Sequence, residues 1–353
     1  MAYADMLDRE TVHDADSHVV EAPESWFDFA DAAVRERMRP LYTATTAPGE
    51  DDLIEHFAAK HADPEFRSRD ADEIMLRKNW KATGSFIKED RPHALDLLGF
   101  DSQLVFNTFG NKYLLQSERD VDGEADLDFA YGLAAAHNRF IVDFCSVDEK
   151  RLLPVGYVPL ADMERSARFA GDALALGCKA LMIASACPTG HSPSHVGLHP
   201  VWAQAQEAGV PIIFHVGGGG RLLDDAYFEN GLPPIPDFHG GEENFRSVDY
   251  MAIPYPPMQT LATMIIDGVM EAFPDLKFGV IEQGASWVPG WMRMLDSAQA
   301  AFHKNEERLR DLSLMPSEYV TRQVRVTPYP AEDVGWIIQN SGPEVCLLSL
   351  IHI

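Results

Sequence analysis

The sequence predicts an α/β fold and, within that class, a (β/α)8 TIM-type barrel of parallel strands surrounded by helices. Eight short apolar runs rich in β-branched residues recur along the chain, and amphipathic helix-like stretches separate most of them. Strands that are apolar throughout are typical of parallel sheets covered by helices. A doubly wound open sheet is the alternative, but no G-x-G-x-x-G pattern follows any run.

The expected elements follow one another in a regular order. The strands are predicted at Thr11–His18, Ser102–Thr108, Leu152–Pro159, Lys179–Ser185, Val210–Val216, Lys277–Gly284, Gln323–Pro328 and Val345–Leu348. Among the helices, Asp162–Leu176 ends at Gly177, a residue type that commonly terminates helices. A second helix, Pro200–Glu207, runs into the fifth strand.

Two connections are longer than a simple helix requires, and we expect residues 19–91 and 217–257 to be insertions over the barrel mouth. Long loops at the carboxyl ends of barrel strands build lids and substrate walls. A surface insertion or a subunit contact is the alternative, and for the first segment neither interpretation is favoured. A chain of 353 residues suits one barrel with insertions, so a single domain is predicted over residues 1–347.

The composition is acidic, with 55 Asp and Glu against 29 Lys and Arg and a formal charge of −26. This balance argues against nucleic acid and anionic membranes as partners. The four cysteines are scattered and are expected to be reduced thiols. No signal peptide and no apolar run of membrane length is visible, so a cytoplasmic location is the default expectation.

The end of the first predicted strand carries a cluster of polar residues that suits a divalent metal. Side chains two apart on a strand share a face, so Asp14, Asp16 and His18 are expected to project together. Carboxylate and imidazole groups are common metal ligands, although a polar strand end leading into a loop is the alternative. His215 ends the fifth strand and would be a third ligand, leaving open positions as in catalytic metal sites.

Three further residues are candidates for chemistry. Glu282 ends the sixth strand and is predicted to act as a general acid/base or to bind the metal, with a salt bridge to Arg325 as the alternative. Arg221 follows four glycines, and its guanidinium suits a substrate carboxylate. Trp287 is a second candidate for substrate binding.

Taken together, these segments resemble the amidohydrolase-related branch of the amidohydrolase superfamily, which includes aminocarboxymuconate-semialdehyde, γ-resorcylate and 5-carboxyvanillate decarboxylases. The segments are HDADSHVVE, VWAQAQEAGVPIIFH and FPDLKFGVIEQGASWVPGWMRMLD. The resemblance implies that Asp16 and His18 occupy the two ligand places of the first strand and His215 that of the fifth. Glu282 stands where many members have histidine, which leaves the mechanism and the substrate open.

The carboxyl-terminal stretch EDVGWIIQNSGPEVCLL resembles the approach to the family's final strand, where an S-D-x-P aspartate binds metal and moves a proton. That aspartate is absent. The last residues, Leu348–Ile353, match the translation of a common transposase sequencing adaptor. We therefore expect 348–353 to be a non-native tail on a truncated chain whose last strand and final helix are incomplete.

The resemblance implies an enzyme with one divalent metal ion, Zn or Mn, that acts on a small carboxylated aromatic or cyclic molecule. Either the substrate loses CO2, or metal-activated water hydrolyses a lactone, ester or amide. Asp16, His18 and His215 hold the metal in both versions, and Glu282 moves the proton. A catalytically inactive binding or scaffold barrel is the third possibility. We expect a homodimer.

Overall fold

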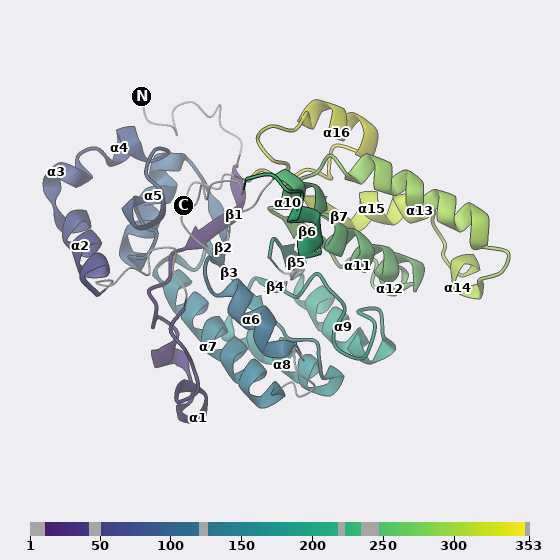
Figure 1. Ribbon diagram of the computed structural model, residues 1–353, viewed down its shortest axis with the longest axis horizontal. Helices are drawn as coiled ribbons and strands as arrows, with labels where there is room; N and C mark the ends of the chain where they lie inside the picture. Colours follow the sequence, from purple (N-terminus) through teal and green to yellow (C-terminus); the bar gives the residue numbers. More distant parts are fainter. Residues whose placement is uncertain (1–10, 42–50, 120–125, 218–222, 234–246, 350–353) are drawn as a thin grey trace.

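The computed structural model describes residues 11–41, 51–119, 126–217, 223–233 and 247–349 (Figure 1). Its centre is a sheet of seven parallel strands whose spatial order equals their order in the chain. The strands are β1 (His13–Val19), β2 (Ser102–Asn107), β3 (Leu152–Tyr157), β4 (Ala180–Met182), β5 (Ile212–His215), β6 (Phe278–Ile281) and β7 (Val324–Val326). Each overlaps a predicted run, so the α/β class and seven of the strands are confirmed.

The eighth predicted strand is replaced by an isolated bridge. Residues 345–348 make one parallel bridge, Val326 to Cys346, with two backbone hydrogen bonds of 2.8 Å to Val326. On the other side, the Ala15 amide donates to the Leu348 carbonyl at 3.0 Å. The segment therefore connects β7 with β1 and curls the sheet toward a barrel, although its pairing is too short to form a strand.

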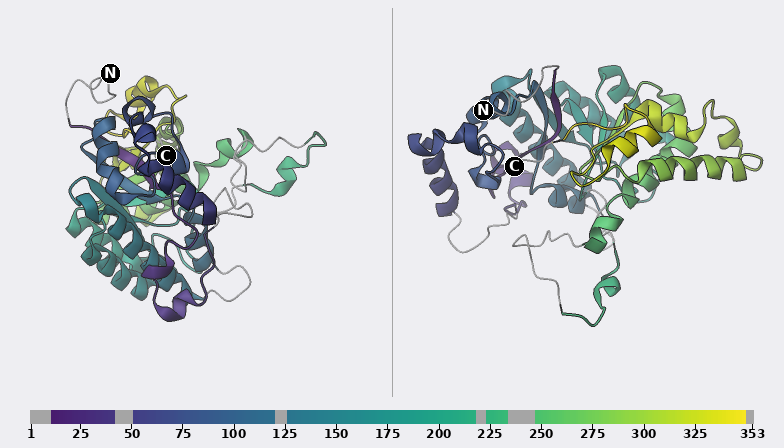
Figure 2. Two further views of the ribbon diagram at one scale, coloured as in Figure 1. Left: turned by 90° about the vertical axis from the view of Figure 1, so that its left-hand side faces the viewer. Right: turned by 90° about the horizontal axis from the view of Figure 1, so that it is seen from above.

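Helices cover the outer side of the curled sheet, and further short helices lie in the two long connections (Figures 1 and 2). They are α1 (Ala32–Arg35), α2 (Asp51–Ala62), α3 (Pro64–Arg67), α4 (Asp70–Glu73), α5 (Arg91–Leu98), α6 (Asn111–Glu118), α7 (Leu127–Cys145), α8 (Met163–Leu176), α9 (His199–Ala208), α10 (Ser247–Ala252), α11 (Tyr255–Ile266), α12 (Val269–Ala272), α13 (Val288–Phe302), α14 (Glu307–Arg310), α15 (Pro316–Gln323) and α16 (Val334–Ser341). None of the helices in the described residues is long and apolar enough to cross a bilayer.

The ends of α8 show how local sequence sets a boundary. The Asp162 side chain accepts a hydrogen bond from the Arg165 amide at 3.0 Å, which satisfies an otherwise unpaired donor of the first turn. At the other end, Gly177 adopts a φ of 118°, a left-handed conformation that glycine enters without a steric penalty. Asp162 is therefore the cap of the predicted helix, and the helix begins at Met163.

Side-chain alternation along the strands divides the apolar core into two layers. On β5, Ile212 and Phe214 pack in the outer layer against the helices, while Ile213 packs in the inner layer enclosed by the sheet. The residue after Phe214 therefore faces inward, and that residue is His215. On β6, Phe278 and Val280 likewise belong to the outer layer.

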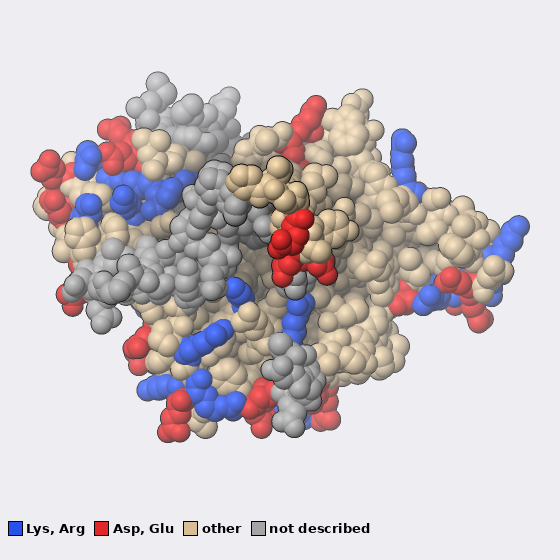
Figure 3. All heavy atoms as spheres, viewed as in Figure 1, with Lys and Arg blue, Asp and Glu red and all other residues tan. Residues whose placement is uncertain are grey.

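The two long connections lie at the carboxyl ends of β1 and β5. The described part of residues 19–91 holds α1 to α4, and its Ser85 carbonyl accepts a hydrogen bond from the Val20 amide at 2.8 Å. In the second connection, a short 3-10 turn, η7 (Asp225–Phe228), stands out from the body of the molecule (Figure 2). On the face shown in Figure 3, acidic and basic side chains are interspersed over the outer helices.

Candidate metal centre

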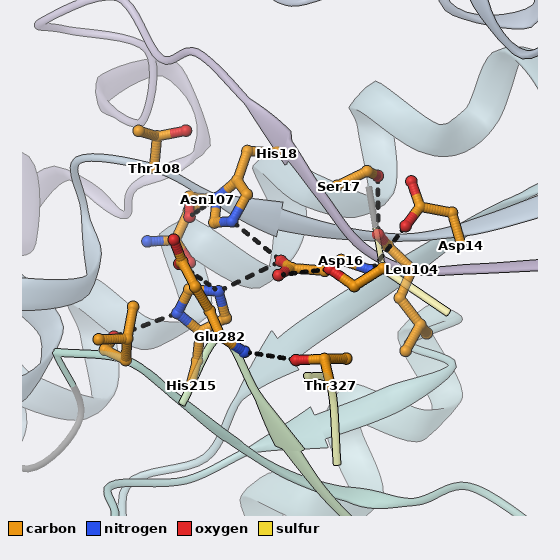
Figure 4. Close-up of polar contacts among 12 residues, drawn as sticks. Asp14, Asp16, Ser17, His18, Leu104, Asn107, Thr108, His215, Glu282 and Thr327 are labelled. Atoms are coloured by element: carbon orange, nitrogen blue, oxygen red, sulfur yellow. Dashed lines mark hydrogen bonds and ion pairs between the residues drawn. The ribbon is translucent and has the colours of Figure 1, made fainter. Parts of the chain in front are cut away.

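Four side chains that are far apart in the sequence converge at the carboxyl ends of the strands. Asp16 and His18 come from β1, His215 from the end of β5 and Glu282 from the residue after β6 (Figure 4). Each offers one ligand atom, and these atoms all lie within 4.8 Å of one another. The first three side chains are buried, and Glu282 is half-buried.

The donor atoms of this cluster face one another. His18 Nε2 lies 3.2 Å from Asp16 Oδ1, and His215 Nε2 lies 3.5 Å from the same oxygen and 3.6 Å from Glu282 Oε2. His215 Nε2 is buried and has no hydrogen-bond partner. Because a buried polar atom without a partner is costly, and because two imidazoles and two carboxylates are common metal ligands, these residues suit one divalent ion.

The other ring nitrogens hold the two imidazoles in place. His18 Nδ1 lies 2.9 Å from the Asn107 carbonyl, and His215 Nδ1 lies 3.1 Å from the Val216 carbonyl. Since a carbonyl can only accept, each Nδ1 carries the proton in these bonds. In the neutral rings the Nε2 lone pairs then point into the cluster, as in metal sites whose histidines are oriented by outer hydrogen bonds.

The Phe106 ring packs beneath the two imidazoles. Its centroid lies 5.8 Å from that of His18 and 4.8 Å from that of His215. The two imidazoles meet edge to face at 5.0 Å. An apolar residue here excludes water from one side of the cluster, which strengthens the electrostatic interactions among its members.

The expectation that Asp14 shares a face with Asp16 and His18 is wrong. The pairing of β1 with β2 shifts register between Asp14 and Ser17, which is the mark of a bulge. Asp14 is turned to the opposite side, where its Oδ2 accepts a hydrogen bond from Gln103 Nε2 at 3.0 Å. The bulge thus separates Asp14 from the ligands although the spacing along the sequence is regular.

A buried arginine supports the same strand from behind. Arg91 donates to the His18 carbonyl at 3.1 Å, to the Gly84 carbonyl at 3.1 Å and to Gln103 Oε1 at 3.2 Å. Burial lowers the pKa of its guanidinium to about 10, which the charge of Asp14 partly offsets. The first long connection therefore holds β1 in position through a buried cation.

The side chains of this cluster strongly affect one another's protonation. Burial raises the pKa of the Asp16 carboxyl, but hydrogen bonds and charges from His18 and His215 outweigh it and hold that pKa well below its usual range. Burial lowers the pKa of His18, but the hydrogen bond and charge of Asp16, with a contribution from Glu282, raise it to about 9. Without a metal, one proton therefore occupies the centre of the cluster at neutral pH.

Glu282 reaches this cluster instead of forming the ion pair with Arg325 that we considered. Arg325 Nη2 donates to Glu344 Oε2 at 3.0 Å, and its Nη1 donates to the Thr321 and Val324 carbonyls. The Glu282 amide donates to Thr327 Oγ1 at 2.8 Å, so its backbone is tied to the residue that follows β7 (Figure 4).

The two predicted substrate contacts, Trp287 and Arg221, both stay predictions. Trp287 is half-buried at the start of α13, where its Nε1 donates to the Gly284 carbonyl at 2.9 Å and its ring meets Trp291 edge to face at 5.3 Å. A role in substrate binding stays a prediction. Arg221 lies outside the described residues, as do the last four residues of the predicted tail, Leu350–Ile353.

A family comparison decides what the chain is related to. A model of the amidohydrolase family matches residues 14–321. The chain belongs to the amidohydrolase family. No curated protein matches its sequence. The resemblance noted in the sequence is thus confirmed at the level of the family.

Solved structures share the fold of this amidohydrolase at low sequence identity. An amidohydrolase from Mycobacterium avium subsp. paratuberculosis K-10 superposes with a TM-score of 0.70 at 19% identity, covering 97% of this chain and 90% of that one. A second structure is 5-carboxyvanillate decarboxylase from Novosphingobium aromaticivorans DSM 12444, complexed with manganese and 4-hydroxy-3-methoxy-5-nitrobenzoic acid. It superposes with a TM-score of 0.60 at 20% identity, covering 98% of this chain and 87% of that one. A third is dihydroxybenzoic acid decarboxylase from Polaromonas sp. JS666, with bound manganese and the inhibitor 2-nitroresorcinol. It superposes with a TM-score of 0.60 at 16% identity, covering 97% of this chain and 86% of that one.

Several residues of this site escaped the sequence analysis. Asn107 and Arg91 contact His18, Gln103 contacts Asp14 and Arg91, and Glu21 accepts backbone hydrogen bonds at 2.9 to 3.3 Å from residues 108–110 after β2. An isolated arginine, glutamine or glutamate carries no local signal of such a role. Only the contacts made in the folded chain identify them.

Proposed function

We propose that this amidohydrolase is a metal-dependent carboxy-lyase that removes CO2 from a small carboxylated aromatic or cyclic acid without oxidation. The observation that carries the proposal is the position of Glu282, whose carboxylate lies 3.6 Å from His215 and is 27% exposed, whereas the other three cluster side chains are buried. An acid that is open to solvent beside a metal cluster can exchange protons and also reach a bound substrate. The structural likeness to two decarboxylases that bind hydroxylated aromatic ligands supports this reaction class.

Asp16, His18 and His215 would hold the ion. Manganese is proposed because the two decarboxylases bind it and because carboxylate ligands suit it, while zinc also suits the imidazoles. A divalent ion here supplies Lewis acidity, which polarises the oxygens of a substrate and stabilises negative charge on them. The three ligands leave the side facing Glu282 for a substrate.

Glu282 would supply the proton that replaces CO2. In its acid form it donates that proton to the substrate carbon that bears the carboxylate. The bond from this carbon to the carboxylate then breaks, its electron pair restores the ring, and CO2 leaves. The Glu282 carboxylate is protonated again from solvent, to which its side chain is partly open. Arg221 and Trp287 remain predictions as substrate contacts, and the homodimer remains a prediction as well.

Hydrolysis of a lactone, ester or amide is the second candidate function. It is supported by the structural likeness to the mycobacterial amidohydrolase, whose TM-score of 0.70 exceeds the 0.60 of each of the two decarboxylases. In this version Glu282 acts as a base that takes a proton from the attacking water. The two reactions differ in whether water is consumed, so the products separate them.

The test is a product assay on protein purified without metal and then loaded anaerobically with Mn2+. A panel of hydroxybenzoates and lactones is followed for CO2 release and for acid release. We expect CO2 release from at least one hydroxybenzoate, and its loss in Glu282→Gln but not in Glu318→Gln, a surface carboxylate that caps α15. Acid release without CO2 would favour the hydrolase, and no turnover with either class would favour the inactive barrel.

A further inference from the structure

The backbone of Glu282 is unusual, and this conformation decides where its side chain points. In the described residues, only Glu282 and Asn79 have positive φ without being glycine, and Glu282 has a φ of 56°. The left-handed region is sterically unfavourable for an L-residue, because Cβ approaches the following carbonyl oxygen. A glutamate therefore stays there only where surrounding contacts hold it.

The alternation of side chains along β6 shows what the left-handed conformation of Glu282 changes. Phe278 and Val280 of β6 face the outer helices, whereas Ile281 belongs to the inner layer. Continuing the strand regularly would turn Glu282 outward, away from His215. The left-handed turn at Glu282 breaks this alternation and brings its carboxylate to the inner side, where it lies 3.6 Å from His215 Nε2.

The contacts that hold this turn come from the loop between β7 and α16. The Tyr329 hydroxyl donates to the Glu282 carbonyl at 2.8 Å. The Glu332 carboxylate accepts from the amides of Tyr329 at 2.7 Å, Ser286 at 2.8 Å and Ala285 at 2.9 Å. One side chain thus ties the loop after β6 to the loop after β7.

Gly284 allows the two loops to approach this closely. A Cβ added at this position would lie 2.9 Å from the Tyr329 ring and 3.1 Å from Glu332 Oε1, and its φ of 69° is again left-handed. Only glycine accommodates both the conformation and the contact. The arrangement is therefore specific to these residues.

We propose that Glu332 and Tyr329 are positioning residues that clamp the backbone of residues 282–286 and thereby aim the Glu282 carboxylate into the metal centre. Neither side chain is among the four that converge on the proposed metal, so both act through Glu282. The inference rests on the proposed metal centre but not on the reaction. It deepens the proposed function because it names what orients the residue that moves the proton.

The experiment is a double-mutant cycle read out by Mn2+ affinity, measured by isothermal titration calorimetry and by electron paramagnetic resonance of free Mn2+. Glu332→Gln is made in the wild-type chain and in Glu282→Ala. We expect it to weaken Mn2+ binding about tenfold in the wild-type chain, in line with outer residues that orient metal ligands, and to have no further effect in Glu282→Ala. Glu318→Gln, which removes a carboxylate that also accepts a backbone amide, is the matched control and leaves the affinity unchanged.

Each other outcome overturns the inference. Unchanged affinity in Glu332→Gln shows that no clamp acts on Glu282, and an equal loss in both backgrounds shows a role that does not pass through Glu282. Should Glu332→Gln not fold, Tyr329→Phe takes its place, because it removes only the hydrogen bond to the Glu282 carbonyl. Its effect on Mn2+ affinity is then measured in the wild-type chain and in Glu282→Ala. Absence of Mn2+ binding by the wild-type chain overturns both the metal centre and the clamp, whereas binding without turnover overturns the reaction alone.

Discussion

The two sides of the metal centre are constructed differently. On β1, Asp16 and His18 are two residues apart in one strand, and a buried layer containing Gln103 and Arg91 supports that strand from behind. On β6, Glu282 lies beyond the end of the strand and reaches the centre through a left-handed turn held by the loop after β7. The β1 side therefore depends on the core of the fold, and the β6 side depends on contacts between two loops.

This difference indicates where the site can change. A residue held by loop contacts can be replaced or reoriented without disturbing the strands, whereas a change behind β1 leaves a buried charge without its partner. Glu282, the position at which the sequence departs from the family it resembles, lies on this β6 side. Variants on the two sides should therefore differ in their effect on folding and on metal binding.

The largest effect on stability is expected for the buried residues on the side of β1 that faces away from the cluster. Arg91→Met removes a buried cation with its hydrogen bonds to the His18 and Gly84 carbonyls, and it takes the positive charge away from the neighbouring buried Asp14, so we expect the free energy of unfolding to fall by about 3–5 kcal/mol. Urea unfolding of the metal-free protein measures this free energy. Arg69→Met, which removes an exposed helical ion pair with Glu73, is expected to change stability by less than about 0.5 kcal/mol. Equal effects of the two variants would show that β1 does not depend on its buried support.

The four side chains of the cluster should differ in their contribution to metal affinity. His18→Ala removes a buried nitrogen donor, so we expect Mn2+ affinity to fall by more than about 100-fold, beyond the range known for residues that only orient ligands. Glu282→Gln keeps an oxygen at the β6 side and loses only the charge, so a loss of about 10- to 100-fold is expected. Calorimetric titration measures both variants. A larger loss in Glu282→Gln than in His18→Ala would reverse the ranking of the two sides.

The pH dependence of metal binding separates the two sides further. Because the pKa of metal-free His18 is raised from 6.5 to about 9, its proton must leave before Nε2 can bind an ion. Mn2+ affinity should therefore rise about tenfold per pH unit up to pH 9 and then level off. The charge of Glu282 contributes to this raised pKa, so Glu282→Gln should level off at lower pH.

The same proton also stabilises the metal-free fold. A folded-state pKa above the unfolded value means that this stabilisation is complete below pH 6.5 and is lost as pH rises through 9. Calorimetry in buffers of different ionisation enthalpy should count about one proton released per Mn2+ at pH 7. No proton release would contradict the assignment of His18 as a ligand.

The smallest effect concerns the strained turn. Glu282→Asn places a residue that tolerates left-handed φ at this position, so the metal-free protein should gain up to about 1 kcal/mol of unfolding free energy while Mn2+ affinity falls. Gly284→Ala is the opposite case, because its new Cβ meets the Tyr329 ring, and it should lose at least about 1 kcal/mol. Thermal unfolding of the two variants measures both changes, and destabilisation by Glu282→Asn would exclude strain at Glu282.

Much of this architecture follows from local patterns in the sequence. The apolar runs, the end of α8 at Gly177 and the polar residues at strand ends depend on neighbours a few residues away. For this reason seven strands, and the position of Asp16, His18, His215 and Glu282 at strand ends on one edge of the sheet, were accessible without a structure. Parallel strands bring their carboxyl ends together, so a strand-end position along the chain becomes a position in space.

By itself, the sequence determined the α/β class, the order of the strands and the chemical types of the side chains at their ends, because these depend on short-range periodicity and composition. Only the tertiary structure decided which way Asp14 and Glu282 face. A bulge turns Asp14 away, and a left-handed turn brings Glu282 in. The physical reason is that the partners holding these residues, Gln103 for Asp14 and Tyr329 for Glu282, lie 89 and 47 positions away along the chain, beyond the reach of any local pattern.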